Sequence, residues 1–195
     1  VEAVGWFRGG QVFVTDGKVT AARGDMGGGV YGPARGPGAL PGWEVVDRLI
    51  GIGRRDFRIT CLSMGNPHCV VFCANLDNLP LSEIGPLFEH HPLFPQGVNT
   101  EFVRVLDRTT IQMRVWERGS GETWACGTGA CASVAAAVRN GLLQRDREIL
   151  VRLRGGDLYI TWRSDGHIVM RGPAAFVFDG TLCPEAEESF SPCAD

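Results

Sequence analysis

The stretch WERGSGETWACGTGACASVAAAV, from Trp116 to Val138, decides how the chain is organised. It passes from a charged, glycine-containing loop through Cys126 into a run of small apolar residues. We expect this run to form the longest helix, from Gly127 to Arg139, because Asn140-Gly141 supplies a stop signal after it. Its core, ACASVAAAV, is apolar on all sides, which predicts a helix enclosed by sheet.

Short β-rich segments on both sides of this helix predict an α+β fold. Asp16-Gly17 is a hairpin signal between two such runs. A short helix is expected from Leu81 to His90, with Pro86 inside it. The glycine- and proline-rich segment Gly27–Gly42 predicts a linker or crossing loop. Strands are expected at Phe57–Ser63, Cys69–Cys73, 98–106 and 110–117. Further short strands joined by tight turns are expected over 149–180.

Length and composition favour an ordinary globular protein. The 195 residues suit one large domain or two small ones. A net charge of -3 with scattered arginines gives no footprint for nucleic acid or for an anionic membrane. The sequence contains no apolar run of membrane-spanning length, and its first residues lack the pattern of a secretory signal. We therefore expect a cytoplasmic protein.

The cysteines predict reduced thiols rather than a disulfide framework. Their number is odd and no Cys-x-x-Cys pair occurs. Cys69 and Cys73 lie near His68 and allow a zinc site as an alternative, but their segment alternates like a buried strand. We expect no metal, and we interpret His90-His91 as structural because neighbouring helical residues diverge. The seven cysteines are Cys61, Cys69, Cys73, Cys126, Cys131, Cys183 and Cys193.

Cys126 has the sequence environment of a reactive thiol. A helix N-terminus presents unpaired N–H groups and a partial positive charge, which predicts a lowered thiol pKa. Gly127 and Gly129 let backbone amides approach a ligand closely, and Thr128 adds a hydroxyl group. The same helix start could therefore bind a carboxylate and hold a base beside its α-carbon.

The loop before Cys126 completes a candidate amino-acid site. Arg118 is suited to pairing with a carboxylate, and Glu117 is suited to an ammonium group. The alternative is a tight strand-to-helix turn with a buried cysteine, preceded by a solvated loop. Composition alone leaves these two interpretations open.

Three separated segments resemble the diaminopimelate epimerase family, and they occur in the family's order. ERGSGETWACGTGACAS, from Glu117 to Ser133, resembles the second cysteine motif of that family. SMGNPHCVVF, from Ser63 to Phe72, and HHPLFPQGVNTEFV, from His90 to Val103, resemble two further family segments. The closing DGHIVMRGPAAFVFDG is similar to the family's last strands, so the resemblance extends from about Asp25 to Gly180.

The resemblance implies a cofactor-independent isomerase that interconverts LL- and meso-diaminopimelate in lysine biosynthesis. Two cysteines would face each other across the substrate, one as thiolate base and one as thiol acid. By this resemblance Cys126 is one of the pair, and Gly127 and Thr128 bind the reacting carboxylate. Glu117 and Arg118 would hold charged groups of the substrate, with Glu117 counted among the catalytic candidates.

The resemblance also assigns roles to three residues before this motif. Asn66 and Asn99 fall on substrate-binding asparagines, and His68 falls on a histidine that assists near the reacting centre. Without the resemblance, Asn66-Pro67 would be a turn, Asn99 would cap a bend, and His68 would be a packed or surface histidine.

The sequence departs from the family in lacking the earlier CGNG-type motif, since no cysteine precedes Cys61. The chain thus resembles an epimerase without its N-terminal part. We expect one lobe with a mixed or antiparallel sheet around a central helix, and a remnant of a second, similar lobe. The expected division is residues 1–26 as last strands of the N-terminal lobe, 27–171 as the C-terminal lobe, 172–183 as a returning strand, and 184–195 as a polar, disordered tail.

The missing cysteine leaves three functional interpretations open. Inversion takes a proton from one face of a carbon and returns it to the other, so one thiol cannot readily do both. In the first interpretation, the chain is therefore part of an epimerase acting on diaminopimelate, as a possible homodimer like other family members. Alternatively, it is a non-catalytic remnant that binds diaminopimelate or a partner chain. The third interpretation is a thiol hydrolase or transferase with Cys126 as nucleophile and His68 as base.

Overall fold

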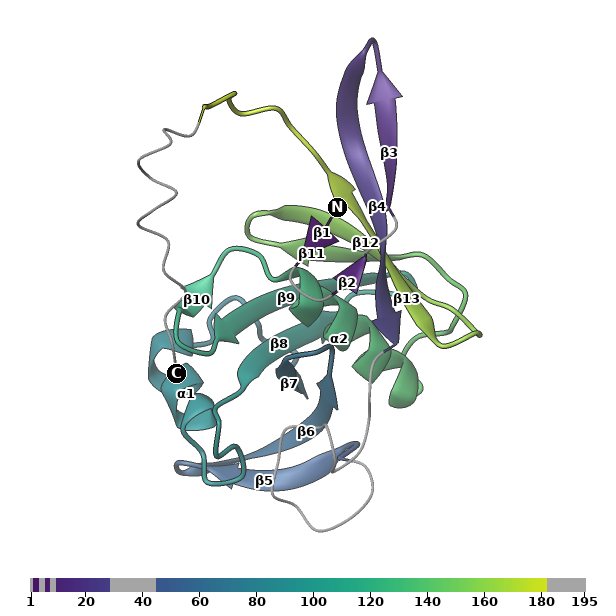
Figure 1. Cartoon of the computed structure of the whole chain (residues 1–195). Helices are drawn as coiled ribbons and strands as arrows, with labels where there is room; N and C mark the ends of the chain where they lie inside the picture. The colour runs from purple at the N-terminus through teal and green to yellow at the C-terminus, as the bar shows by residue number, and fades with distance from the viewer. Residues whose placement is uncertain (1, 4–5, 8–9, 29–44, 182–195) are drawn as a thin grey trace.

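One mixed sheet and two helices make up most of the computed structural model, which describes residues 2–3, 6–7, 10–28 and 45–181 (Figure 1). A separate two-stranded pair is formed by β1 (Glu2–Ala3) and β2 (Trp6–Phe7). The helices are α1 (Leu81–Glu89) and α2 (Gly127–Arg139). The strands of the large sheet are β3 (Gly10–Thr15), β4 (Lys18–Gly28), β5 (Arg48–Ile52), β6 (Arg55–Ser63), β7 (Pro67–Phe72), β8 (Asn99–Val105), β9 (Thr110–Glu117), β10 (Gly121–Thr123), β11 (Ile149–Leu153), β12 (Gly156–Trp162) and β13 (His167–Pro173).

The strand order in this sheet is β3-β4-β13-β12-β11-β9-β8-β7-β6-β5, with β10 paired to β9. The pairs β7–β8 and β9–β11 are parallel, and the remaining neighbours are antiparallel. A parallel pair needs a crossover, and each of these crossovers contains one of the two helices. The α+β class predicted from the sequence is therefore confirmed.

Helix α2 is enclosed by the sheet, as its apolar composition predicts (Figure 1). It contacts strands β6 to β9 together with β12 and β13. Its residues from Gly129 to Ala137 are all buried. Small side chains let the strands approach the helix closely, and Met113, Ile149 and Ile168 fill the space around it. The position of α2 fixes where its N-terminal residue, Cys126, lies.

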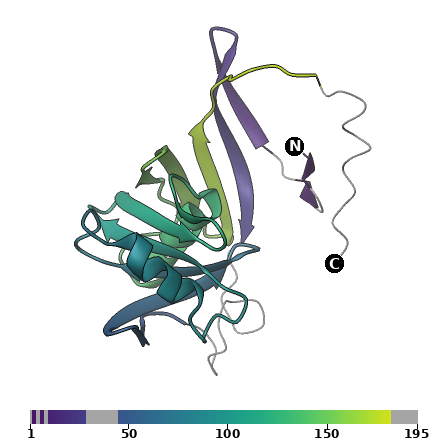
Figure 2. The ribbon, with the colours of Figure 1, turned by 90° about the vertical axis from the view of Figure 1, so that its left-hand side faces the viewer.

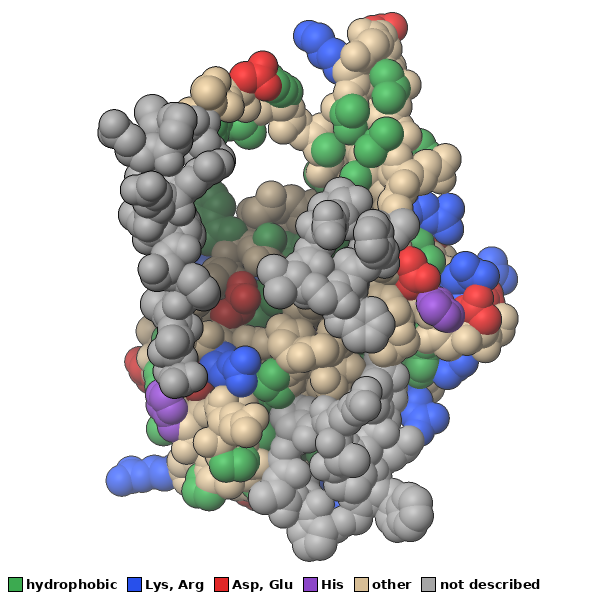
Figure 3. All heavy atoms as spheres, viewed as in Figure 1, with side chains coloured by type: hydrophobic (Ala, Val, Ile, Leu, Met, Phe, Trp, Pro, Cys, Tyr) green, Lys and Arg blue, Asp and Glu red, His purple; other side chains and the backbone are tan. Residues whose placement is uncertain are grey.

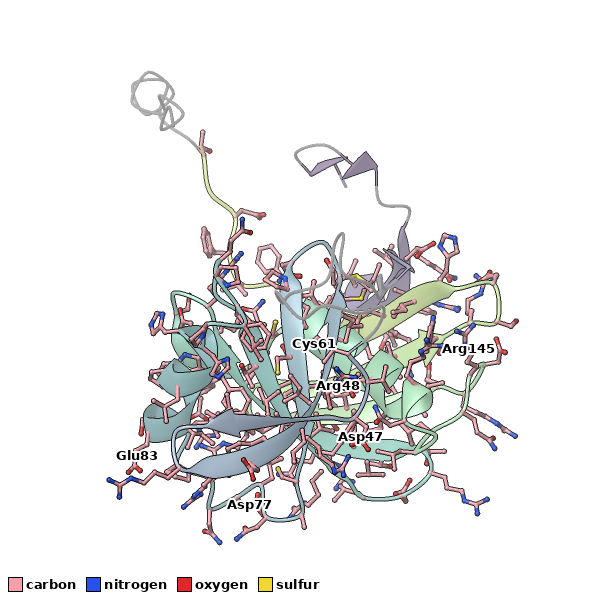
Figure 4. All side chains as sticks on the ribbon, turned by 90° about the horizontal axis from the view of Figure 1, so that it is seen from below. Asp47, Arg48, Cys61, Asp77, Glu83 and Arg145 are labelled. Atoms are coloured by element: carbon pink, nitrogen blue, oxygen red, sulfur yellow. The ribbon has the colours of Figure 1, made fainter. Side chains whose placement is uncertain are left out.

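Strands β6, β7 and β8 separate two apolar cores. Alternate residues face opposite sides: Val103 packs in the α2 core, whereas its neighbour Phe102 packs against Phe88 of α1. Cys61 of β6 and Cys69 of β7 belong to the α1 core. Figure 4 shows Cys61 between Glu83 of α1 on one side and Arg145, which follows α2, on the other. Because both faces are covered, these strands contain few exposed positions.

The β3–β4 hairpin stands away from the rest of the sheet (Figure 2). Its turn residues Asp16 and Gly17 have φ angles of 50° and 75°, the left-handed conformations that a tight hairpin turn requires. The predicted Asp16-Gly17 hairpin is therefore confirmed. Apolar side chains gather on the projecting strands (Figure 3), where Val12, Val14 and Val19 are 60%, 58% and 45% exposed.

Most predicted elements are confirmed, and four short strands were missed. Helices α1 and α2 occur where expected, as do the strand pair β6–β7 and the strand pair β8–β9. The strands β1, β2, β5 and β10 were not predicted, because each is held by pairing with a neighbouring strand rather than by its own pattern. Gly27 and Gly28 of the predicted linker belong to β4, and the rest of Gly27–Gly42 lies outside the described residues, as does 184–195.

A close contact between Gly85 of α1 and Trp116 of β9 connects the α1 core to the segment that leads into the loop before α2. The indole ring of Trp116 occupies the space that a β-carbon at Gly85 would need. Trp116 is in turn fixed by a hydrogen bond from its Nε1–H to the Glu89 carboxylate, at 2.7 Å.

Gly85→Ala should lower the free energy of unfolding by about 1–3 kcal/mol, because the added methyl group displaces a packed indole ring. Urea denaturation measures the change. The control is Gly24→Ala, at a strand position with open space around it, which should stay within about 0.5 kcal/mol of the original chain. Equal effects of the two substitutions would contradict the packing account.

Candidate active site

Cys126 is the N-cap residue of α2. Its backbone is extended, with φ −139° and ψ 109°, and its Sγ accepts a hydrogen bond from the Gly129 N–H at 3.3 Å. The hydroxyl oxygen of Thr128 lies 3.6 Å from the same sulfur. The thiol replaces the side-chain oxygen that usually caps a helix. It is 7% exposed and is therefore held at the edge of the α2 core.

The prediction of a lowered pKa for Cys126 is wrong. Burial, followed by the nearby carboxyl group of Glu101, raises the pKa of this thiol to about 11. The bonds from Thr128 and from the Gly129 N–H act in the opposite direction but are outweighed, and Glu117 adds a further raising effect. Cys126 therefore carries its proton at neutral pH in this structure, as an acid and not as a preformed thiolate.

A chain of polar side chains runs from strand β8 to the thiol. Glu101 Oε1 lies 2.7 Å from His68 Nδ1, and both side chains are fully buried. His68 Nε2 lies 2.9 Å from Asn66 Oδ1. The Asn66 Nδ2–H donates to Thr128 Oγ1 at 3.3 Å, and Thr128 reaches Cys126. The structure therefore brings together four residues that the sequence nominated, Asn66, His68, Cys126 and Thr128.

Strand alternation explains this convergence. His68 is paired with Asn99 across the parallel β7–β8 ladder, and Glu101 is paired with Val70. Val70 and Val103 pack in the α2 core, so residues two positions away along the same strands also face α2. The ends of β7 and β8 thus present polar side chains to the first turn of the helix.

Asn99 connects the start of β7 to the loop after β9. Its Nδ2–H donates to the Pro67 carbonyl at 3.1 Å, and its Oδ1 accepts from the Arg118 backbone N–H at 2.9 Å. Asn99 is buried, and its amide retains one N–H and one lone pair beyond these bonds. The start of β7 and the segment after β9 are held at a fixed separation by this side chain.

Glu117 and Arg118, the predicted charged pair, point to different partners. The Glu117 carboxylate accepts a hydrogen bond from the Thr123 hydroxyl. The Arg118 guanidinium donates to the Gln96 carbonyl at 3.0 Å, and its aliphatic part covers Gly97. Gly97 has a φ of 73°, so the chain turns sharply beneath this arginine. Glu117 is electrostatically close to Cys126, whereas Arg118 lies toward the α1 side of the loop.

Glu89, which the sequence did not nominate, anchors the loop after β9. Its buried carboxylate accepts from Trp116 Nε1–H at 2.7 Å and from the Gly119 N–H at 2.8 Å. Burial alone would raise its pKa, but these two bonds and the charges of His90 and Arg118 lower the pKa below 4.5. The sequence signal was a glutamate at the end of a helix beside a possible indole partner, which is not distinctive.

Glu101 is the second residue that sequence reasoning missed. It lies two positions after Asn99 in the strand NTEFVRV, and an acidic residue among buried strand positions was the available signal. Burial raises its pKa above 4.5, although the neighbouring His68 acts to lower it. Gly127, the predicted carboxylate ligand, lies beside Met170, whose sulfur would be 3.3 Å from a β-carbon at that glycine.

Comparison with known proteins assigns the chain to a family. The sequence model of the diaminopimelate epimerase family matches residues 60–177, which include the thiol and its polar chain. The chain belongs to the diaminopimelate epimerase family. A diaminopimelate epimerase from Synechococcus elongatus is 51% identical over 160 residues, which cover 81% of this chain and 56% of that protein. The enzyme from Acetivibrio thermocellus is 47% identical over 88% of this chain and 61% of its own length.

Solved structures share the fold at low sequence identity. A probable proline racemase from Agrobacterium radiobacter superposes with a TM-score of 0.63 at 15% identity, over 94% of this chain and 58% of that one. A hydroxyproline epimerase from Agrobacterium vitis gives 0.59 at 14% identity, over 83% of this chain and 52% of that one. The chain spans about 56–62% of the length of these two curated diaminopimelate epimerases and of a third, from Desulfitobacterium hafniense.

The described residues were also compared with the expectations on metal ions, disulfides and membrane-spanning helices. Within the described ranges, no three His, Cys, Asp or Glu side chains are arranged to hold a metal ion. None of the five cysteines in those ranges forms a disulfide, and Cys183 and Cys193 lie outside them. Neither of the helices that the structure describes is long and apolar enough to cross a membrane.

Glu89→Gln should lower the free energy of unfolding at pH 7 by about 1–3 kcal/mol, because an amide cannot accept from both Trp116 and Gly119 through two carboxylate oxygens. The folded pKa of Glu89 is lowered, so its contribution is present above pH 4.5 and is lost as the pH falls through the folded value. Urea denaturation at pH 7 and at pH 3 should show the difference between variant and original shrinking in acid.

The control is Glu83→Gln on the exposed face of the same helix (Figure 4), expected within about 0.5 kcal/mol at both pH values. A Glu89→Gln effect that does not depend on pH would contradict the ionised-anchor account.

Proposed function

We propose that this chain forms half of the active site of an epimerase that interconverts LL- and meso-diaminopimelate. The observation that carries the proposal is Cys126, a protonated thiol capping a buried helix within the segment that matches the family model. Relatives named diaminopimelate epimerase support the substrate. The reaction is an isomerisation by proton transfer, without a cofactor.

Cys126 is suited to exchange a proton with an α-carbon. A thiol with a pKa of about 11 remains protonated at neutral pH and supplies a proton to one face of a carbanion. When it acts in the reverse direction, its thiolate is a stronger base than an ordinary cysteine thiolate. The positive charge of a nearby substrate ammonium group would ease its ionisation at that moment.

The first turn of α2 is suited to the reacting carboxylate. The first N–H groups of a helix have no acceptor within it, and the partial positive charge there favours an anion. In the proposed mode, Gly127 and Thr128 hold the carboxylate and stabilise the charge that develops as the α-proton leaves. Asn66, Asn99, Glu117 and Arg118 are proposed to bind the amino groups and the distal end.

We infer that the second acid–base group comes from outside the described residues. Cys61 and Cys69 face the other core, and Cys131 is buried further along α2. Inversion requires a group on the opposite face of the substrate, so a second lobe or a second chain would complete the site.

Exposed apolar residues support such a neighbour. Val12 and Val14 project from β3, and Phe176, Val177 and Phe178 after β13 are 77%, 82% and 78% exposed. Apolar groups in such number favour burial against further structure. We accordingly keep the proposed division, in which residues 1–26 and 172–183 belong with an N-terminal lobe and 27–171 form the C-terminal lobe. A homodimer remains a proposal of the same kind.

The geometry gives little support to a thiol hydrolase that uses His68 as base. Both ring nitrogens of His68 already face polar atoms, Glu101 at 2.7 Å and Asn66 at 2.9 Å. A general base must offer a lone pair to the proton it removes. His68 reaches Cys126 through Asn66 and Thr128 instead.

The test is proton NMR of diaminopimelate with the chain in deuterated water. We expect the α-proton to exchange, and Cys126→Ser to slow the exchange by at least about a hundredfold because a positioned acid–base group is lost. Cys73→Ser, at a partly buried cysteine after β7, is the matched control and should retain exchange. Exchange that persists in Cys126→Ser would contradict the proposal.

Protection of Cys126 from iodoacetamide by diaminopimelate, measured by mass spectrometry, separates binding from chemistry. Protection without exchange would support a binding function and contradict catalysis by this chain. Exchange accompanied by inversion would place the second acid within the chain and overturn its proposed external origin.

A further inference from the structure

The Glu101 carboxyl group is buried, and one of its two oxygens has no hydrogen-bond partner among the described residues. Oε1 lies 2.7 Å from His68 Nδ1, and both side chains are 0% exposed. The other oxygen, Oε2, is the one without such a partner. A buried ionised carboxylate with a bare oxygen is costly, whereas the carbonyl oxygen of a carboxylic acid tolerates that position better.

The position of the protons follows from the Asn66 amide. Its Nδ2 donates to Thr128 Oγ1, which leaves Oδ1 facing His68 Nε2 at 2.9 Å. An amide oxygen accepts and cannot donate, so the proton of this bond belongs to His68 Nε2. A neutral ring with its proton on Nε2 has a lone pair on Nδ1, and Glu101 Oε1 must then supply the proton between them.

The same direction continues to the thiol. Thr128 Oγ1 accepts from Asn66 and has its own proton free for Cys126 Sγ, at 3.6 Å. The donors therefore run from Glu101 through His68, Asn66 and Thr128 toward the sulfur. A donor that points at Sγ stabilises the thiolate each time it forms.

Gly129 gives independent evidence that the carboxyl group is fitted to the first turn of α2. A β-carbon at Gly129 would lie 2.7 Å from Glu101 Oε1 and 3.1 Å from Cys126 Sγ. Both groups pack against one glycine, which no larger residue could replace without moving them. The groups that act electrostatically on Glu101 are His68 and Glu117, and Glu101 in turn acts on Cys69 and Cys126.

We propose that Glu101 is a positioning residue: its carboxylic acid fixes His68 with a proton on Nε2 and thereby aims the Thr128 hydroxyl proton at Cys126 Sγ. This inference deepens the proposed function, because it assigns a proton-directing chain to the proposed acid–base thiol. Glu101 does not touch the substrate in this account and acts through His68.

The first test is long-range ¹H–¹⁵N NMR of the His68 ring at neutral pH. The account predicts a proton on Nε2 in the original chain and in Glu101→Gln, whose side-chain N–H can donate to Nδ1 in place of the acid. A proton on Nδ1 in the original chain, alone or together with one on Nε2, would overturn the proposal, since Glu101 would then be an acceptor.

The second test compares Glu101→Gln with Glu101→Leu by the rate at which iodoacetamide alkylates Cys126 across pH 8–11. Neither side chain has a charge, so their difference isolates the hydrogen bond to His68. We expect alkylation in Glu101→Gln to be about three- to tenfold faster at the same pH, because only that variant keeps a donor to His68 Nδ1 that holds the ring in this tautomer. Equal rates in two folded variants would overturn the proposal.

Both readouts work without substrate, so failure of the positioning role and failure of the epimerase assignment are seen separately. If Glu101→Leu does not fold, the tautomer of His68 in the original chain and in Glu101→Gln still decides the matter.

Discussion

The hydrogen bond from the Gly129 N–H to Cys126 Sγ, at 3.3 Å, ties the reactive thiol to the more deeply buried of the two helices that the structure describes. A helix made of small residues lets six strands close around it, and this enclosure removes water from the thiol. The fold thus decides both the position of Cys126 and its raised pKa. A site on a surface loop would have offered neither the fixed position nor the burial.

The polar groups around the thiol depend on the parallel pairing of β7 and β8. That register places His68 beside Asn99 and Glu101 beside Val70, on the face that meets α2. A shift of one residue would turn these side chains into the α1 core. Glu89 and Asn99 hold the loop after β9 separately, by accepting hydrogen bonds from the Gly119 and Arg118 backbone N–H groups. This charged loop is therefore fixed relative to the thiol.

The sequence predicts a structural feature well when the residues that cause it lie close together in the chain, and poorly when they come from distant strands. Helix α2 was predicted from Gly127 to Arg139 because its composition and its stop signal lie within the helix itself. The pKa of Cys126 was predicted to shift in the wrong direction, since burial and the Glu101 carboxyl group come from strands distant in sequence. Glu101 was overlooked for the same reason, because its role depends on strand register. The family resemblance supplied Asn66 and His68, which spacing alone could not.

The central claim is that Cys126 is a protonated acid at neutral pH, buried beneath the helix start. Ultraviolet titration of thiolate absorbance, taken as the difference between the chain and Cys126→Ser, measures this directly. The account predicts that the Cys126 contribution appears with a pKa of about 11. A Cys126 thiolate already formed at pH 7 would contradict it, and would show that the helix terminus outweighs burial and the Glu101 carboxyl group.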